Sequence, residues 1–329
     1  MEKIEKVKEL HRLKPAYNWI VLFFFGSWAG VGYLTLHVQS FWFRLPFYFT
    51  SGIILHALGI LMHEGVHSKL FKNRRLNRWL GFVCGVPSLL GISAYKAVHL
   101  PHHRYERGVE DPDEFENITR HPPLLKIILI GWFLMGAYFY GLFHIPITGM
   151  KLAKRAEKIK IMQEYFLIVV LLGLVFWLVP LRTLTEVFLI PLLFTAQLSQ
   201  VRGLAEHIFT SGDNPLTASR TVTSNHLVSF FMCNLNYHLE HHIYPAVPWY
   251  DIPRLHNLLL EDFRKAGASI YSSYFLYLKD VLKALFRKTQ NSYLKSAPPQ
   301  GYYRHYMPVL APSKMYNQQK NKEKEVRNV

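Results

Sequence analysis

The chain has 329 residues, a formal net charge of +16 and a 50% share of hydrophobic residues. A net positive charge of this size suits nucleic acid, anionic lipid or the basic loops of a membrane protein. The apolar residues collect in runs too long for ordinary soluble core helices, and basic loops interrupt these runs. The pattern favours an integral membrane protein and counts against nucleic acid as a partner. The only cysteines, Cys84 and Cys233, allow one disulfide and exclude a disulfide framework or a CxxC metal site.

Residues 1–40 are expected to form a basic N-terminal segment and the first membrane span. The stretch from Met1 to Lys14 is charged and helix-prone, and no small-residue cleavage site follows an apolar core, so it does not match a signal peptide. Its basic character predicts a helix on the cytoplasmic membrane surface. A solvated tail is the alternative that the sequence leaves open.

A helix that crosses a bilayer needs about 20 mostly apolar residues. Four segments meet this requirement, and we expect each of them to span the membrane: Tyr17 to His37, Phe41 to Met62, Met162 to Val179 and Leu184 to Val201. Two further apolar stretches are interrupted by glycine and proline, namely Trp79 to Tyr95 and Leu124 to Met150.

The distribution of charge decides where these two interrupted stretches lie. If both stay in the interface or re-enter, nearly all basic residues share one side, and only Arg44 and Arg182 lie in loops on the other. A full crossing by the second stretch would place the basic run KLAKRAEKIK outside. We therefore predict an all-α membrane protein with four spanning helices in two hairpins and a cytoplasmic helical cap.

Histidine is unusually frequent, with 17 residues, and eight of them form three clusters. The clusters are HEGVH (His63, His67), HLPHH (His99, His102, His103) and HLEHH (His238, His241, His242). Histidines four apart share one face of a helix, and an adjacent pair can reach two neighbouring metals. Eight imidazoles exceed the four ligands that one zinc takes, and imidazole also suits iron, copper and nickel. The clusters therefore predict a site for two transition metals.

Seven of the histidines outside the clusters are expected to be structural: His11, His37, His56, His121, His144, His256 and His305. The first cluster also matches H-E-x-x-H, the zinc-peptidase pattern in which Glu64 would act as general base. That alternative leaves the second and third clusters without a role. A membrane metal-binding protein without catalytic activity is a further alternative.

The three clusters and the two apolar hairpins together resemble the membrane fatty-acid desaturase and hydroxylase superfamily. HLPHHRYERGVEDPDEF, residues 99–115, is similar to its second histidine box. NYHLEHHIYPAVPWYDIPRLH, residues 236–256, is similar to its third box and the segment that follows. The resemblance covers residues 41–262, the expected catalytic domain. Residues 263–329 are expected to form a C-terminal cytoplasmic segment that ends in a disordered tail from Lys314 to Val329.

The resemblance implies that nine histidines bind two iron ions: His63, His67, His99, His102, His103, His207, His238, His241 and His242. Gly203 stands where some relatives carry an asparagine that holds a water on one iron. Arg202 and Glu206 share a helical face and are placed to pair, or Glu206 orients a ligand imidazole. Asp111, Asp113 and Glu240 are candidates for the same role, with solvated acids as the alternative.

The implied activity is oxygen-dependent desaturation of a fatty-acyl chain at the di-iron centre. The lipid would enter from the bilayer through an apolar tunnel, and the site would face the cytoplasm. The chain has no heme-binding HPGG motif, so electrons would come from a separate ferredoxin or cytochrome b5. Hydroxylation or ketolation of another lipid, such as a carotenoid or sphingolipid, is the main alternative.

Overall fold

The computed structural model describes residues 2–114, 131, 136–208, 210 and 214–286, and these residues are mostly helical. The long helices are α2 (Ile20–His37), α3 (Phe41–Val66), α8 (Arg155–Leu178) and α10 (Ile190–His207). Shorter elements precede α10: α1 (Glu2–Leu10), η1 (Pro15–Trp19), α4 (Arg74–Gly85), η2 (Val86–Ser88), α5 (Ile92–Tyr105), η4 (Tyr140–His144), α7 (Ile145–Leu152), α9 (Leu181–Leu184) and η5 (Thr185–Leu189).

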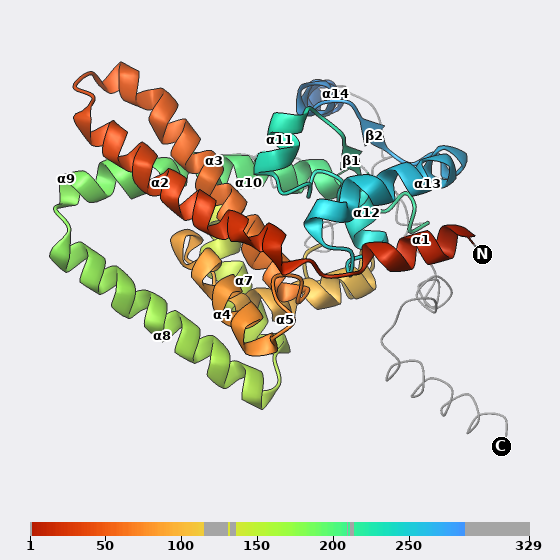
Figure 1. The fold of residues 1–329 in the computed structure, drawn as a ribbon, viewed down its shortest axis with the longest axis horizontal. Helices are drawn as coiled ribbons and strands as arrows, with labels where there is room; N and C mark the ends of the chain where they lie inside the picture. Colours follow the sequence, from red (N-terminus) through yellow and green to blue (C-terminus); the bar gives the residue numbers. More distant parts are fainter. Residues whose placement is uncertain (1, 115–130, 132–135, 209, 211–213, 287–329) are drawn as a thin grey trace.

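The elements after α10 lie in residues 214–286. From here on, the C-terminal segment means these residues and not the shorter range 263–329 expected from the sequence. The elements are β1 (Thr221–Val222), α11 (His226–Phe231), α12 (His238–Ile243), η6 (Trp249–Asp251), α13 (Ile252–Ala266), β2 (Ile270–Tyr271) and α14 (Tyr274–Phe286). The two short strands pair in parallel. In Figure 1 this segment lies at the end of the molecule opposite α9, beside the ends of α3 and α10.

Four helical segments are long and apolar enough to cross a membrane: Pro15–His37, Phe41–Val66, Arg155–Leu178 and Leu181–His207. Each contains one of the four segments predicted to span, apart from one residue at the end of the third. The interrupted stretch Trp79 to Tyr95 falls on a helix pair that bends by 98° between Ser88 and Ile92, as a re-entrant loop or a broken fifth span would. The other stretch, Leu124 to Met150, lies partly outside the described residues.

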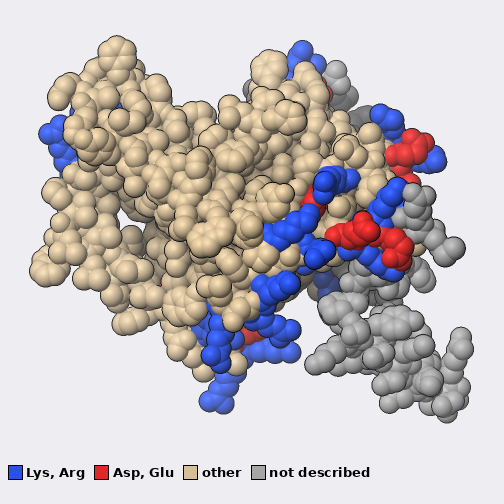
Figure 2. All heavy atoms as spheres, in the orientation of Figure 1, with Lys and Arg blue, Asp and Glu red and all other residues tan. Residues whose placement is uncertain are grey.

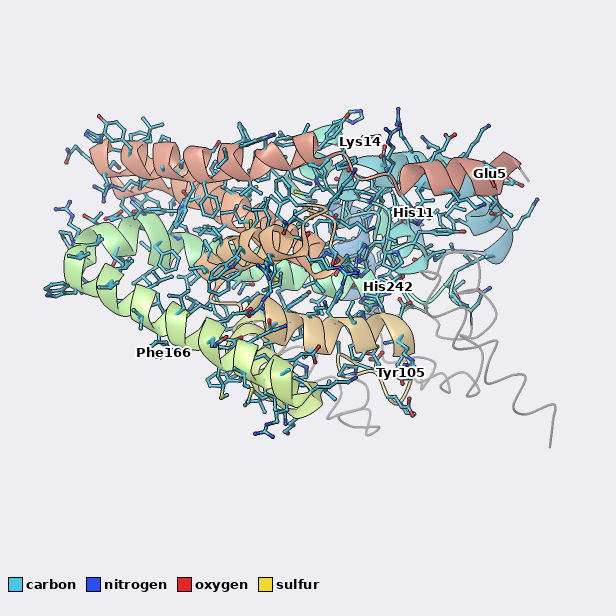
Figure 3. The ribbon with its side chains drawn as sticks, turned by 60° about the horizontal axis from the view of Figure 1, so that its bottom comes forward. Glu5, His11, Lys14, Tyr105, Phe166 and His242 are labelled. Atoms are coloured by element: carbon cyan, nitrogen blue, oxygen red, sulfur yellow. The ribbon has the colours of Figure 1, made fainter. Side chains whose placement is uncertain are left out.

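The spans expose apolar side chains to their surroundings. On α8, Phe166 is 71% exposed and Trp177 is 80% exposed. Figure 3 shows Phe166 on the outer side of α8, whereas His242 lies in the interior. Figure 2 shows few charged side chains over the spans and many more at the other end of the molecule. Such a large apolar surface fits hydrocarbon as the surrounding solvent.

Helix α3 forms the centre of the molecule and packs against α2, α4 and α10. Its contact with α10 is close at Gly52, where a Cβ atom would lie 2.6 Å from the Cβ of Phe194. The hydroxyl of Thr195 donates to the Gly52 carbonyl over 3.1 Å at the same point. This close contact fixes the relative positions of the two helices whose ends reach the histidine clusters.

The N-terminal helix is docked onto the protein. Val7 and Leu10 are buried in a core that they share with Leu255 and Leu259 of α13. Lys14 forms an ion pair of 2.9 Å with Asp251. A free solvated tail is therefore wrong for this segment, because its apolar face is covered by protein.

The two cysteines are described, whereas the C-terminal tail and two of the histidines are not. Cys84 and Cys233 are buried free cysteines, so the disulfide that the sequence allowed is not formed. The tail from Lys314 to Val329, His121 and His305 lie outside the described residues.

Candidate metal centre

The three histidine clusters and His207 meet where four helices come together. His63 lies in the last turn of α3 and His67 caps that helix. The second cluster lies on α5, the third cluster forms most of α12, and His207 ends α10. Segments separated by more than 100 residues in the sequence thus contribute to one buried site.

Helical spacing divides the clusters into two groups of ligand atoms. Pairs four residues apart stay together on one helical face, and the middle histidine of each H-x-x-H-H cluster, His102 or His241, turns to the other group. The five-histidine group consists of His63, His67, His99, His103 and His241, whose ligand atoms all lie within 4.8 Å of one another. The four-histidine group consists of His102, His207, His238 and His242, which share His207 between two overlapping sets. The adjacent histidines His102 and His103 thus face different groups, as do His241 and His242.

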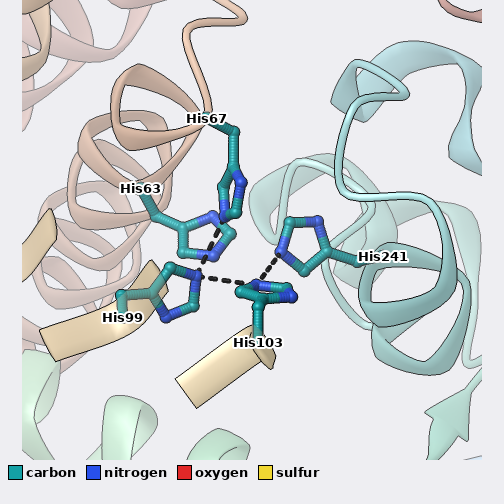
Figure 4. Close-up of side chains that lie close together, drawn as sticks. All are labelled: His63, His67, His99, His103 and His241. Carbon is teal, nitrogen blue, oxygen red and sulfur yellow. Dashed lines mark hydrogen bonds between the residues drawn. The ribbon is translucent and has the colours of Figure 1, made fainter. Parts of the chain in front are cut away.

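The Nε2 atoms converge inside each group. In the five-histidine group, the Nε2 atom of His99 lies 2.9 Å from those of His67 and His103, and His103 lies 3.1 Å from His241 (Figure 4). In the four-histidine group, the Nε2 atom of His207 lies 3.3 Å from that of His102 and 3.0 Å from that of His238.

These positions fit metal ligation better than they fit hydrogen bonding among imidazoles. The buried Nε2 atoms of His63 and His242 have no hydrogen-bond partner among the described residues. Ligand nitrogens at about 2.1 Å from a metal and at right angles to one another are about 3 Å apart, which matches the observed separations. An all-imidazole donor set suits iron, copper, nickel or zinc. The residues therefore fit two transition-metal ions, one in each group.

Two of the imidazoles, those of His238 and His241, are held in the neutral form that a metal requires. Burial lowers the pKa of His238 and of His241 well below the ordinary value, and neighbouring imidazoles lower it further. A neutral imidazole keeps one nitrogen lone pair for a metal, whereas an imidazolium has none.

Carboxylates lie behind the four-histidine group. Asp111 accepts a hydrogen bond of 2.9 Å from Nδ1 of His102, and a Glu206 oxygen lies 3.2 Å from Nδ1 of His238. Glu106 places its oxygens 3.1 Å from Nδ1 of His242 and 3.6 Å from Nδ1 of His207. Such partners fix the imidazole tautomer and leave Nε2 for the metal.

The sequence predicted part of this carboxylate set. Glu206 pairs with Arg202 at 2.6 Å, as one of the two expectations had it, and its contact with His238 keeps the other as a prediction. Asp113 instead contacts Tyr140 and His144, and Glu240 contacts Thr221 and His256, so neither meets a clustered histidine.

The sequence did not predict a role for Glu106. The only sequence feature that could have singled out Glu106 is its place three residues after His103, at the end of α5. The buried Glu106 carboxyl would have a raised pKa from burial alone, yet its contacts with His242 and His102 hold that pKa below its ordinary value.

Glu64 does not adopt the role that the zinc-peptidase pattern requires. It is 1% exposed, and its Oε2 accepts a hydrogen bond of 3.1 Å from the backbone N–H of Trp249. Its other oxygen lies 3.8 Å from Nδ1 of His63, on the side away from the converging Nε2 atoms. Glu64 therefore joins α3 to the C-terminal segment.

A cavity of about 270 Å³ leads to the histidines. Apolar residues such as Gly59, Ile60, Leu90, Leu192 and Ala196 line it together with five of the nine histidines. Gly203 also lines it, and a Cβ atom there would meet no described atom within 4 Å. The cavity can hold an apolar chain with one part beside the two groups.

Comparison with known proteins places the chain in a family. The family model for fatty acid desaturases matches residues 39–274. The chain is 31% identical to a sphingolipid delta(4)-desaturase of Drosophila melanogaster over 285 residues, which are 79% of this chain and 80% of that protein. It is 25% identical to a sphingolipid delta(4)-desaturase of Gallus gallus over 272 residues, with 79% of each chain covered. It is also 25% identical to a sphingolipid delta(4)-desaturase/C4-monooxygenase of Homo sapiens over 272 residues, again with 79% of each chain covered.

The chain belongs to the fatty acid desaturase family. It is an integral-membrane oxidoreductase that desaturates or hydroxylates a lipid, and the predicted resemblance is confirmed. The zinc-peptidase and non-catalytic alternatives are therefore wrong.

Proposed function

We propose that this enzyme introduces a double bond into the hydrocarbon chain of a sphingolipid, in an oxygen-dependent reaction at a di-iron centre held by the nine histidines. The observation that carries the proposal is the convergence of their Nε2 atoms into two groups at the end of an apolar cavity. The relatives named above act on sphingolipids, which favours that substrate over the simple fatty-acyl lipid that the sequence first suggested.

In this proposal the five-histidine group holds one iron and the four-histidine group the other. Bound iron would supply the activation of oxygen that an unreactive C–H bond requires. The protein supplies placement, because small displacements of reacting atoms from near-attack geometry have large effects on rate. Ile60 and Leu192 would hold the chain by apolar contact, while His63 and His238 border the reacting carbons.

Polar groups at the metal end of the cavity support a lipid whose head group lies near the reacting carbons. Arg202 lines the cavity and pairs with Glu206 at 2.6 Å. Tyr140 and Asp113, 3.1 Å apart, also line the cavity. A sphingolipid has hydroxyl and amide groups close to carbon 4, and these would meet the polar wall. A fatty-acyl chain that reacts at its middle would place only hydrocarbon there.

Hydroxylation is the second candidate outcome. One human relative is named both a desaturase and a C4-monooxygenase, so its name includes both reactions. Removal of a second hydrogen from the neighbouring carbon gives an alkene, and addition of a hydroxyl group to the first carbon gives an alcohol. Placement of the chain against the histidines would decide between them.

We also propose that the site faces the cytoplasm and that a separate cytochrome b5 or ferredoxin delivers electrons. The strong basic bias of the loops on the side of the histidine clusters supports the orientation. The same charge suits an acidic electron carrier.

The test uses a saturated, deuterated N-octanoyl sphinganine given to purified, iron-loaded enzyme with oxygen and a reducing system. Mass spectrometry should show a product that has lost two hydrogens from the sphingoid chain, and none with a His241→Ala variant. A gain of one oxygen would move the assignment to hydroxylase. Conversion of acyl lipids alone would contradict the sphingolipid proposal.

A further inference from the structure

The two groups of histidines differ in the charge that surrounds them. In the four-histidine group, every Nδ1 atom has a carboxylate oxygen nearby, at 2.9 Å for His102, 3.2 Å for His238, 3.1 Å for His242 and 3.6 Å for His207. Three buried carboxylates provide these contacts: Asp111, Glu106 and Glu206. Glu106 caps α5 and Asp111 follows it in the same loop, whereas Glu206 lies on α10.

In the described part of the chain, no carboxylate oxygen lies as close to the five-histidine group. Its shortest carboxylate contact is the one between His63 and Glu64, at 3.8 Å, which is too long for a hydrogen bond. The buried Nδ1 atoms of His63, His103 and His241 have no hydrogen-bond partner among the described residues. The Nδ1 atoms of His207, His238 and His242 also lack a bond of good hydrogen-bond geometry there, so the two groups differ in how near the carboxylates lie and not in the number of hydrogen bonds. The five-histidine group thus has one carboxylate, 3.8 Å from an Nδ1 atom, whereas the four-histidine group has three carboxylates within 3.6 Å.

The opposite charges near the carboxylates do not remove this difference. Arg202 pairs with Glu206 at 2.6 Å and neutralises one of the three. Asp111 accepts from the backbone N–H groups of Arg107 and Asp113, at 3.0 Å and 2.9 Å, which keeps its orientation without adding a full positive charge. The four-histidine group therefore remains the more negative of the two.

We infer that the two metal positions are chemically unequal, and that the iron in the four-histidine group is oxidised first. The inference rests on the di-iron centre proposed above. A carboxylate close to the far nitrogen of an imidazole makes that ligand more basic, and a more basic ligand stabilises the higher charge of ferric iron. The direct Coulomb attraction between the carboxylates and the metal acts in the same direction inside a buried site. Asp111, Glu106 and Glu206 are thus positioning residues that act through the ligands.

Stepwise oxidation of ⁵⁷Fe-loaded enzyme, followed by Mössbauer spectroscopy, tests this inference. The fully reduced enzyme should show two ferrous signals of equal area. With one oxidising equivalent per protein, one of the two signals should convert to ferric while the other stays ferrous. Equal partial oxidation of both signals would overturn the inference, although the di-iron centre itself would stand. Fewer than two irons per chain would overturn both.

A Glu106→Gln variant identifies which iron is oxidised first. Loss of the negative charge beside His242 and His207 should shift only the signal of that iron and reduce its preference for oxidation. Removal of outer partners typically costs 10–100-fold in metal affinity, so a ferrous chelator should also extract one of the two irons about 10–100-fold faster. Unchanged spectra and unchanged extraction would overturn the assignment.

Glu240→Gln is the matched control. Glu240 is a buried carboxylate between clustered histidines, but its oxygens contact Thr221 and His256. This variant should oxidise and lose iron as the wild type does. If Glu106→Gln fails to fold, Asp111→Asn tests the same group through His102. An equal effect of Glu240→Gln on both irons would show a general loss of structure and overturn the specific role.

Discussion

The outer face of α8 and the region around α12 place opposite demands on the same chain. On α8, apolar side chains such as Phe166 and Trp177 face outward and make few contacts within the protein. On α12, five consecutive residues from His238 to His242 are buried, and four of them are polar. The outer face of α8 can cross a membrane if the helix is long and apolar enough, whereas the buried region around α12 depends on contacts between individual residues. Sequence changes should therefore have little effect on the first and large effects on the second.

The largest effect is expected from His103→Ala. His103 belongs to the five-histidine group and its ring stacks on His242 of the other group, with centroids 4.1 Å apart. Loss of this imidazole should lower activity by at least about 100-fold, because even partners outside the ligand set are worth 10–100-fold in metal affinity. Iron per protein and turnover are the measurements.

His37→Ala is the matched control for this prediction. His37 ends α2, and its Nδ1 lies 2.8 Å from the carbonyl oxygen of Tyr33 on an exposed surface. The control should retain iron and activity. Equal loss in both variants would contradict the assignment of His103 to a metal site.

Removal of iron should destabilise the region around α12 and leave the outer spans largely unaffected. A ligand present at 1,000 times its dissociation constant adds about 4 kcal/mol of stability. Loss of this contribution should lower the melting temperature by about 10 °C. Thermal unfolding with and without a chelator measures the change, and re-added iron should restore the higher value. Identical melting of both forms would show that the histidines form a stable core without metal.

Gly203→Leu should reduce activity without loss of stability. Gly203 lines the cavity that leads to the histidines, and a Cβ atom there meets no described atom within 4 Å, so we expect the leucine side chain to extend into the cavity. The added bulk should displace the lipid chain and lower kcat/KM by about 10–100-fold, since pocket contacts of this size discriminate to that degree.

Gly173→Leu provides the comparison on the lipid-facing side. Gly173 lies on α8, and a Cβ atom there also meets nothing within 4 Å. The two variants add the same side chain to a helix, and only the first should affect turnover. Full activity of Gly203→Leu would show that the lipid does not occupy this part of the cavity.

The same contrast explains which parts of the protein were predictable. Hydropathy is a local property, so all four spanning segments were found, although α8 starts at Arg155 rather than Met162. The helix continues into its basic end because polar residues there still form backbone hydrogen bonds. The eight clustered histidines were recognised because their spacing on helices is also local, whereas His207 was proposed from the family resemblance.

The partners of the histidines were less predictable, because they depend on how distant segments meet. Glu206 and Asp111 were identified as candidates, yet Asp113 and Glu240 carried the same signal and contact other residues. Glu106 had no distinguishing feature until α12 was placed beside α5. The hollow beside Gly203 likewise depends on the packing of α3 and α10.

The smallest effect is expected from Tyr277→Phe, which tests how firmly the end of α10 is held. The buried hydroxyl of Tyr277 donates to the carbonyl of Leu204 over 2.7 Å, three residues before His207. Its loss should cost about 1 kcal/mol, or roughly 2–4 °C in melting temperature. Tyr33→Phe is the control, because Tyr33 is 61% exposed on α2 and should show no change. Equal melting temperatures of the two variants would mean that this hydrogen bond does not stabilise the end of α10. Arg220, which donates to the carbonyls of Ala205 and Ile208, would then be sufficient to hold the helix end.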